Sequence, residues 1–228
     1  MAHARGLTAR GGLGKRRLFG GFCALHVFAT GRHWQSQSDM KFSLDYTVSV
    51  DGRAIDSKAL LADVHSLQNI LVDGAALEGA LLVHVEGKQL PAEYEEPLVR
   101  LVHLWVGKLP WVIGGDTETV ALRNSAECFA FVPTGDGVEV SFYAGDDAAV
   151  EDYILEPTIV RLDMFVEESL RMAESLLQFL GRLSPAASVN EDVQDLKMSF
   201  DEAKKAWGEN HPLVVYDQLT EKHTHTYI

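Results

Sequence analysis

The sequence predicts an α+β domain, in which a mostly antiparallel sheet of about five to six strands carries helices packed on one face. The expected order of elements, β-α-β-α-β-β-β-β-α-α, places strands in succession and two helices at the end. Consecutive strands pair readily in antiparallel fashion, whereas a doubly wound parallel sheet needs strands and helices in alternation. A change of composition at Asp39–Met40 marks where we expect the domain to begin.

The first 39 residues differ from the rest of the chain in charge. They contain six basic residues and one acid, a net charge of +5, whereas the other 189 residues have 14 basic and 32 acidic residues, a net charge of −18. We therefore expect a disordered basic extension over 1–39, a single α+β domain over 40–208 and a tail over 209–228. Alternatives for the extension are a start codon placed too early, a weak secretory signal and a transit peptide. The expected location is cytoplasmic.

The first half of the domain begins with a clear strand. From Phe42 to Val50 apolar and polar residues alternate, which predicts a strand with one buried face, and Asp51-Gly52 predicts a turn after it. Further elements are a helix over 58–72 capped by Ser57, a strand over 80–85 and a helix over 93–109. The last of these starts with acids, has Pro97 in its first turn and is closed by Pro110 and the Gly114-Gly115 pair.

The second half reads as strands followed by helices. A short strand near 120–122 precedes a hairpin, whose arms at 128–132 and 138–143 flank the turn sequence PTGDG. The acid-rich stretch 145–153 is expected to be a solvated loop. The remaining elements are a strand near 153–155 or 158–162, a helix over 163–180 capped by Asp163 and stopped by Gly181 and Ser184-Pro185, and a helix started by Asn190 and ended by Gly208.

Several classes of function are disfavoured. A net charge of −13 argues against a nucleic-acid-binding protein, which needs a basic surface. The sequence has no Gly-x-Ser-x-Gly, P-loop or Gly-x-Gly-x-x-Gly motif, and no apolar run long enough to cross a membrane. Cys23 and Cys128 form no disulfide or zinc pattern, and Cys128 is expected in the core. His223 and His225 lie in the tail without further ligands, so no metal or cofactor is predicted.

The acidity of the domain suggests a partner instead. A strongly acidic surface attracts basic proteins and repels nucleic acids and anionic membranes. We therefore expect an acidic, non-catalytic protein-binding domain, in one version an immunity- or antitoxin-type inhibitor of a basic effector. The candidate partner-binding acids are Asp146, Asp147, Glu151, Asp152, Glu93, Glu95 and Glu96.

Two alternatives use other residues. An enzyme without a short motif would build its pocket from distant residues such as His84, His103 and Arg123. A subunit of a homo- or hetero-oligomer would use the aromatic-rich segment 94–113 as its interface.

Overall fold

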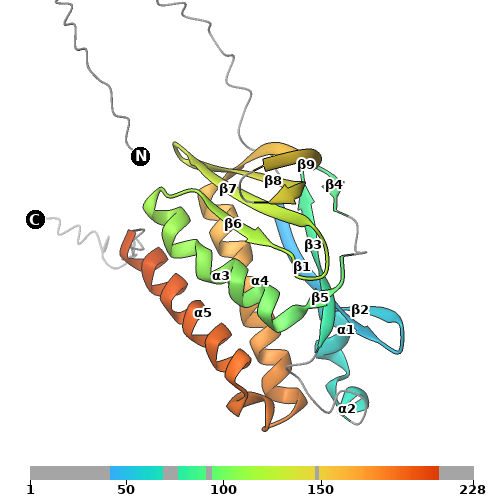
Figure 1. The fold of residues 1–228 in the computed structure, drawn as a ribbon. Coiled ribbons are helices and arrows are strands. Elements are labelled where there is room, and N and C mark those ends of the chain that lie inside the picture. Colours follow the sequence, from blue (N-terminus) through green and yellow to red (C-terminus); the bar gives the residue numbers. More distant parts are fainter. Residues whose placement is uncertain (1–41, 69–76, 91–93, 147–148, 211–228) are drawn as a thin grey trace, which may run out of the picture. The chain divides into compact units, whose positions relative to one another are not determined.

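The computed structural model describes residues 42–68, 77–90, 94–146 and 149–210, and Figure 1 shows their arrangement. The predicted α+β class is confirmed, and the sheets are antiparallel. The strands divide into two sheets, of five and four strands, rather than forming the one sheet expected. Both sheets and the helices contribute side chains to a single hydrophobic core.

The first sheet is built around β1 (Phe42–Val50), the strand that the alternation predicted. Its five apolar side chains are buried, and Asp51 and Gly52 turn the chain with φ values of 49° and 72° into β2. Positive φ at both turn residues suits a two-residue hairpin. The other strands are β2 (Arg53–Asp56), β3 (Glu78–Val85), β4 (Lys88–Gln89) and β5 (Glu96–Pro97), in the order β2-β1-β3-β4, with β5 also paired to β3.

The second sheet contains β6 (Glu118–Ala121), β7 (Glu127–Thr134), β8 (Gly137–Asp146) and β9 (Ala149–Arg161), in that order. The predicted hairpin is β7–β8, and β7 is internal to the sheet, as its apolar sequence suggested. β9 is one strand of 13 residues rather than one of the two short strands expected. Its pairing with β8 has three register shifts. β6 and β9 are therefore the edge strands of this sheet.

The long helices form two layers against the sheets. α3 (Leu98–Gly114) and α4 (Leu162–Leu183) pack on the sheets, and α5 (Glu191–Asn210) packs on α3 and α4 (Figure 1). Trp105 of α3 is fully buried, and its ring lies 5.0 Å from that of Phe129 and 4.6 Å from that of Phe131. Its Nε1 donates to Ser169 Oγ of α4 at 2.9 Å. One side chain thus joins both helices to β7.

The predicted helix over 58–72 is wrong in its start, and it is not continuous over the part that the structure describes. Residues 69–72 of this prediction lie outside the described residues. Asp56 rather than Ser57 caps α1 (Ser57–Ala62), because its carboxylate accepts from Ala59 N at 2.8 Å. Asp63 interrupts the helix and accepts from Ser66 N, which starts α2 (Val64–Leu67). Aspartate favours such caps because its short side chain satisfies the free N–H groups of a first turn.

The helices extend past the first of the predicted stop signals. α3 continues through Pro110 and ends at the predicted Gly114-Gly115 pair, and α4 continues through Gly181 to Leu183, next to the predicted stop at Ser184-Pro185. α5 continues through Gly208 to Asn210. Buried side chains beyond the break, such as Val112 and Leu183, favour continued helix over the local preference of proline or glycine. Arg161, whose side chain makes no cap hydrogen bond, occupies the N-cap position of α4, so Asp163 lies in the first turn and is not the cap that the sequence predicted. α3 starts at Leu98, so no acid lies in its first turn.

Candidate functional site

The predicted partner-binding acids lie in different settings. Glu151 and Asp152 are exposed and belong to edge strand β9, so the prediction of an acidic loop over 145–153 is wrong on either side of 147–148. Asp146 ends β8. Glu93 and Asp147 lie outside the described residues.

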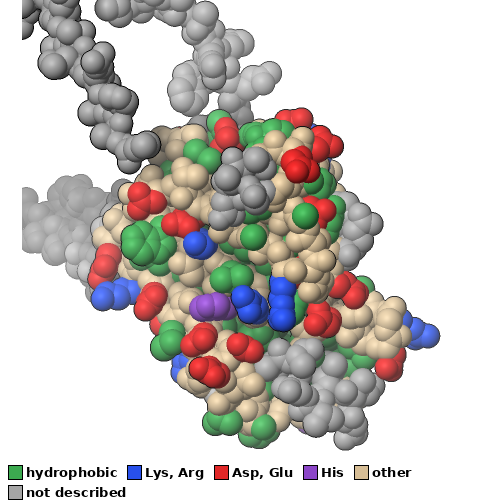
Figure 2. All heavy atoms as spheres, viewed as in Figure 1, with side chains coloured by type: hydrophobic (Ala, Val, Ile, Leu, Met, Phe, Trp, Pro, Cys, Tyr) green, Lys and Arg blue, Asp and Glu red, His purple; other side chains and the backbone are tan. Residues whose placement is uncertain are grey.

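The exposed strand β9 combines carboxylates with apolar side chains. Glu151, Asp152 and Glu156 are exposed on it. Apolar side chains that are 38 to 48% exposed lie among them, namely Val150, Tyr153, Ile154 and Ile159. No described strand pairs with the outer edge of β9. In Figure 2, Asp and Glu side chains lie next to hydrophobic ones over β8 and β9. We call this surface, the exposed side chains from Val150 to Ile159, the β9 edge.

Glu95 and Glu96 are neighbours with opposite environments. Glu95 is exposed, whereas Glu96 is 2% exposed and its two carboxylate oxygens accept from Arg123 N at 2.8 Å and Asn124 N at 2.7 Å. Just beyond the end of β6, the Glu96 carboxylate thus accepts backbone hydrogen bonds as the carbonyl groups of a neighbouring strand would. Because both oxygens are engaged inside the protein, Glu96 offers little of its charge to a partner.

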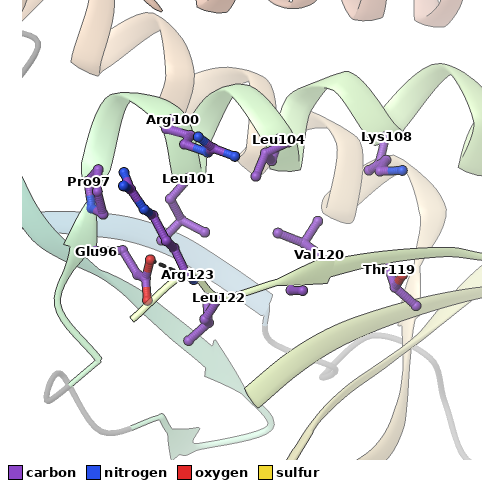
Figure 3. Close-up of a pocket in the computed structure, with 11 residues that line it drawn as sticks. Glu96, Pro97, Arg100, Leu101, Leu104, Lys108, Thr119, Val120, Leu122 and Arg123 are labelled. Atoms are coloured by element: carbon purple, nitrogen blue, oxygen red, sulfur yellow. Dashed lines mark hydrogen bonds between the residues drawn. The ribbon is translucent and has the colours of Figure 1, made fainter. Parts of the chain in front are cut away.

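A second surface feature is a cavity of about 410 Å³ between α3 and β6, which we call the α3–β6 groove (Figure 3). Five consecutive residues, 119–123, form one wall. Successive side chains of a strand point to opposite faces, so a wall of consecutive residues is the backbone edge of the strand. The other wall is one face of α3, with Arg100, Leu101, Leu104 and Lys108, and Pro97 just before the helix.

Charge is unevenly distributed along the α3–β6 groove. Figure 3 shows Arg100, Arg123 and Glu96 at one end and Lys108 at the other. Lys108 Nζ lies 2.7 Å from a carboxylate oxygen of Glu118, so its charge is balanced. Between the ends lie apolar side chains of both walls, namely Leu101, Leu104, Val120 and Leu122. Lys and Arg side chains gather over α3 and β6 in Figure 2.

The residues expected for an enzyme pocket are not brought together. Arg123 lines the α3–β6 groove, but His103 Nδ1 lies 3.1 Å from Ser199 Oγ in the contact between α3 and α5. His84 belongs to β3 and does not line the groove. The segment 94–113 forms mainly α3; Trp105 is buried, and Trp111 is 58% exposed.

Two other kinds of site concern metal ions and membranes. Among the described residues, no group of three or more His, Cys, Asp and Glu side chains is arranged to hold a metal ion. No helix in the described ranges is long and apolar enough to span a bilayer. Cys128 is buried in β7, where the sequence placed it.

No protein-family model, curated protein or solved structure that was compared with this chain matches it. The chemistry of the β9 edge and of the α3–β6 groove is therefore what bears on function. Of the acids on the β9 edge, the sequence predicted Glu151 and Asp152 as partner-binding residues. It missed the groove, although Arg100, Leu104 and Lys108 recur every four residues and so share one helix face. That spacing indicates a partly basic helix face but does not tell which strand lies opposite it.

Proposed function

We propose that the protein is an acidic, non-catalytic protein-binding domain that docks a basic protein on the β9 edge. An immunity- or antitoxin-type inhibitor of a basic effector is one form of this function. The observation that carries the proposal is that exposed carboxylates and exposed apolar side chains lie beside one another on an edge strand.

Such an edge supplies three kinds of contact to a partner. Its outer backbone groups can accept a further strand, as in other cases of β-augmentation. Its apolar side chains, such as Tyr153 and Ile154, gain from burial by about 25 cal/mol per Å². Its carboxylates attract lysine and arginine. The net charge of −18 over residues 40–228 adds long-range attraction that speeds encounter with a basic partner.

The same charges select against self-association. Two copies of the β9 edge would place Glu151 and Asp152 near like charges, and like charges opposite each other in a sheet are destabilising. A basic strand escapes the charge repulsion, so the edge discriminates between partners by charge.

The proposal predicts that the β9 edge binds a lysine-rich strand. The probe is a fluorescent 12-residue peptide of alternating lysine and valine, measured by anisotropy. Reversal of two carboxylates in E151K/D152K turns attraction into repulsion, so we expect affinity to fall about tenfold or more, equivalent to about 1.4 kcal/mol. Affinity for the unmodified protein should also fall as salt rises from 50 to 500 mM.

The matched control reverses two other adjacent, exposed acids, Asp201 and Glu202 of α5. D201K/E202K changes the net charge equally but lies away from β9, so its affinity for the peptide should stay within about twofold of the unmodified protein. Equal losses of peptide affinity in both variants would show that the attraction depends on net charge alone. That result would contradict a docking site at the β9 edge.

A further inference from the structure

We propose that the α3–β6 groove binds the C-terminal end of an extended peptide, which adds as a strand to β6 and places its terminal carboxylate at Arg100 and Arg123. This site goes beyond the proposed function, because it lies at the opposite edge of the second sheet and selects the opposite charge.

The backbone of β6 is open on its outer side. Leu122 N donates to Glu127 O of β7 at 2.9 Å. Because inward and outward residues alternate in an antiparallel pair, the N–H and C=O groups of Thr119 and Ala121 point away from β7. Within the described part of the chain, those outward backbone groups have no hydrogen-bond partner. They face the groove, since both residues line it.

In two other places of the described structure, outward backbone groups are paired with side chains. β2 pairs with β1 only from Thr47 to Val50, so it does not cover Leu44 of β1. The Leu44 N–H instead donates to Glu168 Oε2 at 3.3 Å, and the Leu44 carbonyl accepts from Arg171. Glu96 pairs in the same way with the amides of Arg123 and Asn124. Thr119 and Ala121 differ, because an elongated cavity rather than a side chain lies beside them.

The position of Glu96 determines where an added strand must stop. Its carboxylate already occupies the amides of Arg123 and Asn124, so a peptide pairs with β6 only as far as Ala121. At that point the peptide reaches the end of the groove that holds Arg100 and Arg123. A chain that terminates there runs parallel to β6 and presents its α-carboxylate to these arginines.

Charge at that end suits a carboxylate. Within the described residues, neither the Arg100 nor the Arg123 side chain has an ion pair, whereas Lys108 at the other end is paired with Glu118. The Glu96 carboxylate lies at the same end as the two arginines, but its oxygens accept from the backbone amides of Arg123 and Asn124, so the two guanidinium groups leave this end of the groove net positive. Guanidinium groups bind carboxylates with paired hydrogen bonds, which adds orientation as well as energy.

The middle of the groove suits an apolar side chain. Leu104 from α3 and Val120 from β6 lie there on opposite walls (Figure 3). A volume of about 410 Å³ falls within the range of ligand pockets, about 300–1,000 Å³. The expected ligand is thus a short extended segment that ends in an apolar residue with a free carboxylate.

The test uses two fluorescent hexapeptides of sequence TVTVTV, one with a free C-terminal carboxylate and one with a C-terminal amide. Anisotropy should show the free acid binding at least tenfold more tightly than the amide. R100A/R123A should remove that preference. A121P deletes an outward N–H that the β6–β7 ladder does not use, so the fold should persist while binding of both peptides is lost.

The matched control is K204A/K205A, which removes two exposed lysines of α5 and should leave both affinities within about twofold. Equal affinities for acid and amide, unchanged affinity in R100A/R123A, or no binding of the free acid up to millimolar concentration would each overturn the proposal. E151K/D152K should not weaken this peptide, and R100A/R123A should not weaken the lysine-rich one, so the two proposals fail separately.

Discussion

At the scale of single residues, Tyr46 shows how burial sets chemistry in this protein. It lies in the middle of β1 with no exposed surface, and its hydroxyl is 3.4 Å from Ser175 Oγ of α4. Burial, which disfavours the charged phenolate, raises the pKa of Tyr46 to about 12. The buried tyrosine therefore keeps its proton at a pH at which an unfolded tyrosine has lost it.

This difference predicts a loss of stability in alkali. The contribution of Tyr46 is fully present below pH 10, the ordinary pKa, and is lost as the pH rises to about 12. Two pH units correspond to about 2–3 kcal/mol of unfolding free energy. Urea unfolding measures the loss of unfolding free energy between pH 9 and pH 12. This loss should be about 2–3 kcal/mol smaller in Y46F than in the unmodified protein. Y153F, which alters a tyrosine that is 39% exposed, should behave like the unmodified protein.

Residue environments were only partly predictable from the sequence. Alternation along 42–50 predicts which face of β1 is buried, and Tyr46 follows it. Glu95 and Glu96 lie side by side in one acidic run, yet only Glu96 is buried. Its environment depends on Arg123 and Asn124, more than 25 residues away, and no local pattern encodes that contact.

At the scale of elements, two glycines differ in what surrounds them. A Cβ on Gly79 of β3 would lie 2.1 Å from the backbone oxygen of Thr47 in β1, which no flexible side chain can relieve. A Cβ on Gly107 of α3 would lie 3.5 Å from Ser199 Oγ, an ordinary van der Waals contact. The strand therefore requires its glycine, whereas the helix does not.

Alanine substitutions should separate these two glycines. G79A should lower the unfolding free energy by about 2–3 kcal/mol, because β1 and β3 must move apart. G107A should raise it by about 0.5–1 kcal/mol, because alanine favours a helix interior. Urea unfolding measures both changes. A neutral G79A would show that the close approach of β1 and β3 is wrong.

Strands were easier to predict than helix ends. Period-two alternation and turn residues located β1 and the β7–β8 hairpin, because both signals are local. α3 and α4 end at Gly114-Gly115 and before Ser184-Pro185, the second of the two stop signals predicted for each, and they pass Pro110 and Gly181, since burial of residues such as Val112 overrides a local preference. α5 passes Gly208. The α3–β6 groove joins a helix to a strand edge, and sequence spacing gives only the helix side.

At the scale of the whole molecule, the charge of the chain is divided at residue 39. Residues 1–39 have a net charge of +5, and residues 40–228 have −18. The described hydrophobic core begins with Phe42. We therefore expect the domain to fold without the basic extension.

Removal of residues 1–39 should change the midpoint of thermal unfolding by less than about 2 °C. Differential scanning calorimetry of residues 40–228 and of the full chain measures this. A chain that starts at Tyr46 serves as the control, because it also lacks Phe42 and Leu44 of the core and should be clearly destabilised. A drop of several degrees for residues 40–228 would contradict the predicted boundary.

The central claim, that the β9 edge docks a basic partner, is tested most directly by amide hydrogen exchange. Exchange is followed by mass spectrometry with and without the lysine–valine peptide. Because an added strand pairs with the outer backbone groups of β9, exchange within residues 149–161 should slow, while exchange around Thr119 and Ala121 stays unchanged. Unchanged exchange in β9 under conditions where the peptide is bound, with protection elsewhere, would contradict the account.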